Sequence, residues 1–248
     1  MPRRYASPPL LEAVCDVRFG QGAGWDPTVP GLLFHRLRDR FPIRRHDPVG
    51  PPLRLEVAGQ EQMLPVPQRM RFWDAEESMF VQVSENQLVI DRTVGYTVWD
   101  DFLPIVTDAY AAYTEIADTR DVTRIGLRYV NEVDFGTTPS LRLEDWFNFY
   151  PHLGPDLPGD HGPFSTTVLF GYEDDGLDLR LQLGNMQPAQ EFRHALRLDL
   201  DCYTRDAPGA MSPDDMAVRL NAAHTRIDQV FEGCLTSELR QRFGEVSD

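Results

Sequence analysis

The chain has 248 residues, a formal net charge of −15 and 24 arginines, with no lysine at all. The absence of lysine excludes a P-loop lysine, a Schiff-base lysine and a lysine general base. The acidic balance argues against a protein that coats nucleic acid with a basic patch, and no apolar run reaches the roughly 20 residues of a membrane span.

The first half of the chain predicts one strand, one helix and then a group of hairpins. Apolar side chains occupy every second position over 11–19, and this period of two predicts a half-exposed strand. A helix is expected over 27–41, with Asp26 as its cap. Three more strands and a second long helix are expected at 69–74, 79–83, 87–92 and 98–117.

The second half repeats this arrangement with cleaner alternation. Asp175-Gly176 is a hairpin signal between two alternating segments. Ser212 and Asp215 have the spacing of a capping box, with Pro213 at the first position of a long helix. The expected strands and a shorter helix lie at 124–135, 164–172, 177–183, 196–202 and 142–149.

These elements have the order β-α-β-β-β-α twice. One apolar and one charged face on each strand is typical of antiparallel sheet. We therefore predict an α+β protein of two topologically similar modules, each a curved antiparallel sheet packed on a long helix. The expected modules are 1–120 and 121–248, and one continuous domain is the alternative. Two proline-rich segments, 47–67 and 150–163, are expected to be functional lids or disordered insertions.

The three cysteines, Cys15, Cys202 and Cys234, are odd in number and widely spaced, which indicates a reducing compartment. Each lies in an apolar pattern, so we predict core residues rather than thiol nucleophiles. Residues 1–7 contain two arginines with no apolar segment after them, which is not a signal-peptide pattern. Together these features predict a cytoplasmic protein.

The usual signatures of catalysis do not fit this chain. The run Gly20 to Gly24 is similar to a dinucleotide-binding turn, but Trp25 stands where the third glycine belongs and the preceding strand alternates. No GxSxG elbow and no HxxxH pair is present. Asp199 and Asp201 share one strand face and are a candidate Mg²⁺ pair, although cross-strand arginine partners are the preferred interpretation. We predict no catalytic residue, no metal and no cofactor.

Four residues of the strand at 124–135 are candidate binding residues. Arg124 and Arg128 share one face and are able to clamp an anion, with ordinary salt bridges as the preferred alternative. Asn131 falls on the apolar face with Tyr129, and a buried amide without partners costs about 1–3 kcal/mol. Asn131 therefore either anchors neighbouring backbone or lines, with Tyr129, a pocket between sheet and helix.

Three stretches carry a family resemblance. They are PPLLEAVCDVRF at 8–19, the central run RIGLRYVN at 124–131, and the helical ending from His224 through LRQRFG. Together they resemble a sporadically distributed family of uncharacterised bacterial proteins of about this length. The resemblance implies an accessory gene product, such as a component of antiviral defence or of a toxin–antitoxin-like module, and it supplies no catalytic residues to carry over to this chain.

The sequence thus favours a non-enzymatic cytosolic protein that binds another protein. Its acidity suits a partner with a basic surface, and assembly into a homo-oligomer is left as an open alternative. The first alternative is a small-molecule or nucleotide binder with a pocket between sheet and helix. The second alternative is a metal-dependent enzyme that uses Asp199 and Asp201.

Overall fold

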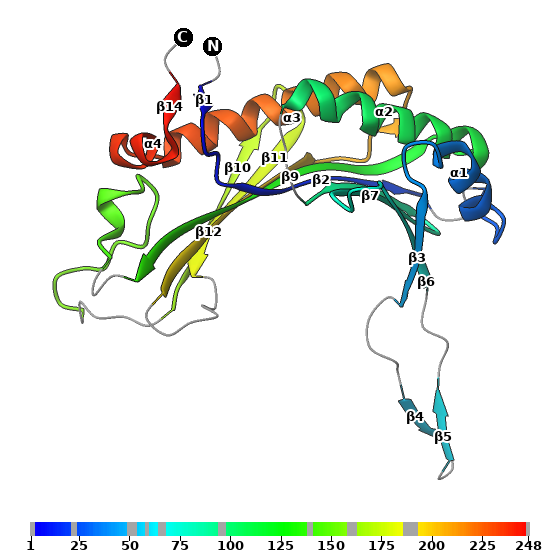
Figure 1. Ribbon diagram of the computed structural model, residues 1–248, viewed down its shortest axis with the longest axis horizontal. Helices are drawn as coiled ribbons and strands as arrows, with labels where there is room; N and C mark the ends of the chain where they lie inside the picture. The colour runs from blue at the N-terminus through cyan, green and yellow to red at the C-terminus, as the bar shows by residue number, and fades with distance from the viewer. Residues whose placement is uncertain are drawn as a thin grey trace. The chain divides into compact units, whose positions relative to one another are not determined.

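The computed structural model describes residues 3–20, 24–48, 54–57, 60–63, 68–93, 98–137, 141–157, 163–185 and 193–246. Its helices are α1 (Val29–Leu37), α2 (Trp99–Ile116), α3 (Pro213–Cys234), α4 (Ser237–Phe243) and the short 3-10 helix η1 (Leu143–Asp145) (Figure 1). Its strands are β1 (Arg4–Tyr5), β2 (Leu10–Phe19), β3 (Ile43–Pro48), β4 (Arg54–Val57), β5 (Gln60–Met63), β6 (Gln68–Trp73), β7 (Met79–Ser84), β8 (Gln87–Arg92), β9 (Asp121–Thr137), β10 (Ser165–Tyr172), β11 (Leu177–Asn185), β12 (Arg193–Thr204), β13 (Gly209–Ala210) and β14 (Glu245–Val246).

The chain forms two compact units, each assembled from separate segments. Unit 1 comprises Met1–Val14, Gly126–Asp206 and Val218–Asp248, and unit 2 comprises Cys15–Ile125 and Ala207–Ala217. Strands β2 and β9 and helix α3 pass from one unit to the other. The expected division into modules after residue 120 stays a prediction, as does the repeated topology.

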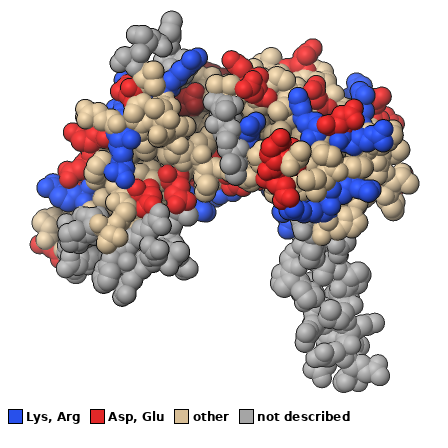
Figure 2. All heavy atoms as spheres, viewed as in Figure 1, with Lys and Arg blue, Asp and Glu red and all other residues tan. Residues whose placement is uncertain are grey.

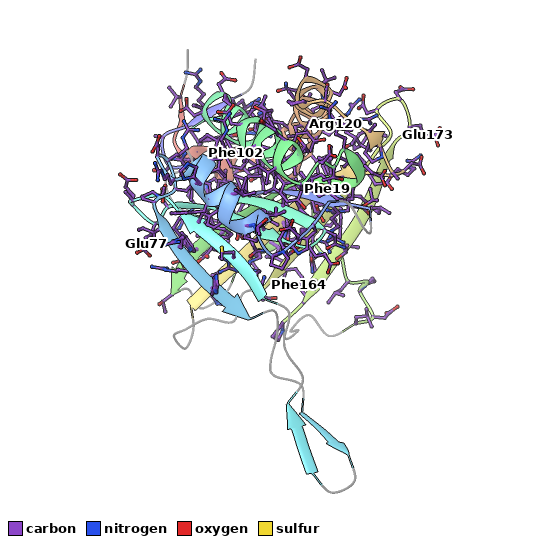
Figure 3. All side chains as sticks on the ribbon, turned by 90° about the vertical axis from the view of Figure 1, so that its right-hand side faces the viewer. Phe19, Glu77, Phe102, Arg120, Phe164 and Glu173 are labelled. Carbon is purple, nitrogen blue, oxygen red and sulfur yellow. The ribbon has the colours of Figure 1, made fainter. Side chains whose placement is uncertain are left out.

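Unit 2 packs helices α1 and α2 on one face of a sheet with the strand order β9-β2-β8-β7-β6-β3 (Figure 1). Phe19 and Phe102 lie in the apolar layer between helix and sheet (Figure 3), and the Phe19 ring is 4.7 Å from the ring of Tyr113. Gly24 has φ +42°, and a Cβ there would meet the Ala117 carbonyl oxygen at 1.6 Å. This glycine is needed because the backbone passes against the end of α2.

Unit 1 has the strand order β10-β11-β12-β9-β2, with α3 and α4 on one face. Because adjacent side chains on a strand point to opposite faces, alternate residues of β11 and β12 form the inner lining beneath α3. These residues are almost fully buried: Leu177, Leu179, Leu181, Leu183, Leu196, Leu198, Leu200 and Cys202. The opposite, outer face carries the arginines and aspartates between them.

The structure confirms an α+β protein with a mostly antiparallel sheet, and it confirms several details. In the capping box, the Asp215 amide donates to Ser212 Oγ at 3.1 Å while the Ser212 amide donates to the Asp215 carboxylate at 3.2 Å. Gly176 has φ +63° in the predicted hairpin turn. The three cysteines are buried, and burial raises the pKa of Cys202 and of Cys234 to about 12.

Two local predictions are wrong. The expected helix at 142–149 is only the 3-10 turn η1, because the chain after it bonds to the end of α3 instead. The backbone N–H of Asn148 donates to the backbone carbonyl of Cys234, and the backbone N–H of Thr236 donates to the backbone carbonyl of Trp146. The second wrong prediction is the cap of α1, because its N-cap residue is Thr28 rather than Asp26. On β10, the alternating apolar side chains share the inner face but are only partly covered. Val168 and Phe170 are each 37% exposed, because β10 is the edge strand of the sheet.

The remaining predicted segments are only partly described. Residues 21–23 of the glycine-rich turn lie outside the described residues, as do 158–162 of the second proline-rich segment. The first proline-rich segment contains strand β4, which pairs with β5 in a separate two-stranded ribbon. Among the described helices, none is long and apolar enough to cross a membrane.

Candidate interaction surface on unit 1

Strand β9 positions all four predicted binding residues, but it divides them between two faces. Arg124 and Arg128 lie on the outer face, and Tyr129 and Asn131 lie on the inner face. Arg124 belongs to unit 2, whereas the other three belong to unit 1. The four residues therefore contribute to different environments rather than to one site.

Arg128 is held by a carboxylate on the neighbouring strand β12. Its Nε donates to Asp199 Oδ1 at 2.8 Å and its NH2 donates to Asp199 Oδ2 at 2.5 Å, a bidentate pair. The Asp199 side chain is 6% exposed and that of Arg128 is 39% exposed. The hydrogen bonds to Asp199 raise the pKa of Arg128. This pair is a structural anchor of the outer face, because the buried carboxylate is fully matched by its partner.

Two further arginines on outward-facing positions are paired with a carboxylate on a neighbouring strand. Arg124 NH1 donates to Asp16 Oδ2 at 2.7 Å within unit 2. In unit 1, Arg180 NH2 donates to Asp201 Oδ2 at 3.3 Å. Asp199 and Asp201 thus each face an arginine, and no group of three metal-binding side chains occurs among the described residues. The arginines neutralise the charge that a divalent cation would need at this position.

On the inner face, Tyr129 begins a short polar chain that leads to α3. The Tyr129 hydroxyl is 3.0 Å from His224 Nδ1, and His224 Nε2 is 3.4 Å from Asp228 Oδ2. A neutral His224 that accepts from Tyr129 at Nδ1 carries its proton on Nε2 and presents it to Asp228. Burial, and then repulsion from the Glu232 carboxylate, raise the pKa of Asp228 to about 6.

Asn131 uses its amide to join two strands. It is 3% exposed, and its Nδ2 donates to the backbone carbonyl of Leu198, the residue directly opposite on β12, at 3.2 Å. This contact satisfies the buried donor, as expected for an amide that anchors neighbouring backbone. Tyr129 and Asn131 are both buried and hydrogen-bonded beneath α3.

The outer face of unit 1 contains a groove of about 430 Å³ that crosses the strands from β9 to the start of β10. Its floor includes the Arg128–Asp199 pair, and Gln182 Nε2 donates to Ser165 Oγ at 2.8 Å along one wall. Arg197 is exposed there. The complete lining is Arg128, Phe164, Ser165, Gln182, Gly184, Asn185, Arg197 and Asp199.

The edge strand β10 differs in composition from β11 and β12, the charged strands beside it. Acidic and arginine side chains are interspersed over much of the molecule (Figure 2), but β10 has the sequence STTVLFGY, with no charge and no proline. Three consecutive large apolar residues, Val168, Leu169 and Phe170, are exposed, with Leu169 at 59%. Figure 3 labels Phe164 and Glu173, the residues that immediately precede and follow the strand.

Sequence reasoning did not identify this edge, although a signal for it was present. Val168-Leu169-Phe170 interrupts the alternation because apolar side chains occupy both faces of the strand. The contact between Tyr129 and His224 carried no signal, since the two residues are 95 positions apart in the sequence. No family model matches the chain, and no curated protein matches it.

Proposed function

We propose that this chain is a non-catalytic protein-binding component that pairs an extended, largely uncharged segment of another polypeptide with the edge of β10. The observation that carries the proposal is the exposed uncharged edge itself. Charged residues make up 25% of the chain, yet none lies within these eight positions. Soluble proteins usually protect an edge strand with charges, proline or a bulge, because an open edge is a template for strand addition.

The pairing of β10 with β11 supports the same function. All eight residues of β10 pair in register with Ser165 opposite Gly184 and Tyr172 opposite Leu177, without a bulge. The strand is therefore held straight from one side, and no other strand of the described residues pairs with its second side. An added strand would gain backbone hydrogen bonds and would cover the exposed apolar side chains, which is how strand addition obtains both affinity and specificity.

Site-specific photocrosslinking tests the proposal in cells. A photoreactive phenylalanine analogue at Leu169 is expected to give one discrete crosslinked species, whereas the same analogue at Val218 gives none. Val218 is the matched control because it is also an exposed apolar residue, at 69%, but lies on α3. Equal crosslinking from both positions, or none from Leu169, contradicts strand addition at β10.

The groove on the outer face of unit 1 favours a second candidate, the binding of a small anionic molecule. Arg197 and Arg128 contribute two positive charges to the lining and Asp199 one negative charge. A carboxylate or phosphate would be attracted to this net positive site. In a thermal-shift screen of small carboxylates and phosphates, a genuine ligand raises the melting temperature of the native protein but not that of Arg197→Ala. Equal shifts of the melting temperature for both proteins exclude the groove as the binding site.

The biological setting remains a prediction from the family resemblance. We propose a cytosolic regulatory or immunity component of a bacterial defence or toxin–antitoxin-like module, as the resemblance implies. A partner with a basic surface, bound to an acidic part of the chain rather than to the uncharged β10 edge, stays part of that expectation because the chain is acidic. Mass spectrometry of the species crosslinked through Leu169 identifies the partner and tests this setting directly.

A further inference from the structure

We infer that the polypeptide that pairs with β10 is a second copy of this chain, joined by antiparallel β10–β10 pairing about a two-fold axis at Leu169. This inference rests on the proposed function, since it names the occupant of the same edge. It specifies which residues face each other across the axis, so it is testable at the level of register.

The hydrogen bonds at the start of β10 show which backbone groups point outward. The backbone N–H of Asn185 donates to the backbone carbonyl of Phe164, so these two opposed residues form a hydrogen-bonded pair. Hydrogen-bonded and non-hydrogen-bonded pairs alternate along an antiparallel ladder. Residues 166, 168, 170 and 172 therefore bond to β11. The amides and carbonyls of the four intervening residues point away from β11, and these residues are Ser165, Thr167, Leu169 and Gly171.

An axis at Leu169 matches these outward groups to their own copies. Leu169 then lies opposite Leu169 of the second copy, and Thr167 lies opposite Gly171 in the next hydrogen-bonded pairs. The intervening positions place Val168 opposite Phe170. Pairs of an aromatic with a β-branched residue are among the favourable cross-strand contacts, so the sequence of β10 is complementary to itself in this register.

The same arrangement covers exposed apolar side chains on both faces of the sheet. Val168 and Phe170 lie on the inner face, opposite the buried Leu181 and Leu179, yet each remains 37% exposed. Leu169 lies on the outer face. A second β10 at the usual strand spacing of about 4.8 Å places apolar atoms against all three side chains. It thus removes apolar surface from water on both faces of the sheet.

Charge does not oppose the pairing at the strand itself. No charged residue of β10 lies opposite another, and Glu173, the first charge beyond the strand, falls opposite Ser165 of the second copy. The net charge of −15 repels two copies at long range, but at physiological ionic strength this repulsion is screened over about 8 Å. A two-fold contact uses the same edge in both copies, so assembly ends at the dimer.

Disulfide trapping of the full-length protein tests the register. Hydrogen-bonded antiparallel partners have Cα atoms about 5.5 Å apart, within the range of a disulfide, so Leu169→Cys is expected to form a covalent dimer on mild oxidation. Thr167→Cys should not, because its copy would lie four residues away, or ~14 Å. The native cysteines are buried and do not compete.

Sedimentation equilibrium supplies an independent readout without cysteine. The unmodified protein is expected to dimerise in the micromolar range, since one strand pair is a small interface. Leu169→Arg places two like charges opposite each other and should weaken the dimer at least tenfold, whereas Leu169→Thr should weaken it less. Circular dichroism of both variants checks that the monomers stay folded.

The outcomes separate this inference from the proposed function. A covalent dimer from Leu169→Cys alone supports the inference, and dimers from both cysteine variants overturn the register. A monomeric native protein overturns the inference. In that case, a crosslink from Leu169 to a different protein leaves the proposed function in place, and the absence of any crosslink removes the function as well.

Discussion

The Arg128–Asp199 pair allows a quantitative test of how the outer face of unit 1 is held together. Substituting Arg128→Thr removes the guanidinium and leaves a carboxylate that is 6% exposed in the folded protein. Threonine is chosen because its β-branched side chain suits a strand. The nearby pair of Arg180 with Asp201 is the matched control, since it also joins adjacent strands but is 3.3 Å long, with side chains 41% and 15% exposed.

The expected magnitudes differ because the two carboxylates differ in burial. Removing one partner of a fully buried pair costs about 3–5 kcal/mol. Arg128 is 39% exposed, so its loss also admits water to the carboxylate, and we expect the free energy of unfolding to fall by about 2 kcal/mol. Arg180→Thr acts on a more exposed pair and should cost less than about 1 kcal/mol.

Urea unfolding followed by circular dichroism measures both losses. The double variant Arg128→Thr/Asp199→Thr removes both charges and should be more stable than Arg128→Thr alone, because no unpaired buried carboxylate remains. Equal losses for Arg128→Thr and Arg180→Thr would refute the assignment of Asp199 as a buried charge that depends on its partner.

Three further predictions concern other parts of the chain. Burial raises the pKa of Asp228 to about 6, so the folded protein favours the protonated carboxyl. The stabilising contribution of this protonated form to the free energy of unfolding is present below about pH 4 and is lost as the pH rises through 6. Asp228→Asn should therefore stabilise the protein at pH 8 by about 1 kcal/mol, allowing for its partial exposure, and should have no effect at pH 4 in thermal unfolding; a pH-independent difference contradicts this. Gly24→Ala should cost at least about 2 kcal/mol in urea unfolding, whereas Gly31→Ala, in open space within α1, should gain about 0.5–1 kcal/mol; similar effects of the two would argue against the close approach to α2. Ser212→Ala removes the capping hydroxyl of α3 and should cost about 1 kcal/mol by the same assay, and an unchanged stability would show that the capping box contributes nothing.

The local patterns of the sequence determined most of the secondary structure. Alternation predicted β2, β11 and β12, and the serine, proline and aspartate at 212–215 predicted the start of α3. These predictions succeed because period and capping depend on residues within a few positions of one another. The cross-strand pairing of Asp199 and Asp201 with arginines was also predictable, since alternating charges on adjacent antiparallel strands face each other.

Local patterns misled where a segment's surroundings decide its structure. The segment at 142–149 has a helical pattern, but its backbone groups find partners at the end of α3, a site over 80 residues away in the chain. The apolar face of β10 reads like that of β11. Only the position of each strand in the sheet determines that the leucines of β11 are buried while Val168 and Phe170 are exposed.

The sequence by itself determined the α+β class, the antiparallel hairpins and the pairing of opposite charges on the outer face. The tertiary structure alone decided that β10 is an edge, that His224 meets Tyr129, and that Arg124 lies in a different unit from the other three predicted residues of β9. The physical reason is that the period of the sequence pattern determines which side chains share one face of a strand or helix. What covers that face depends on strand order and helix placement, which arise from contacts between distant segments of the chain.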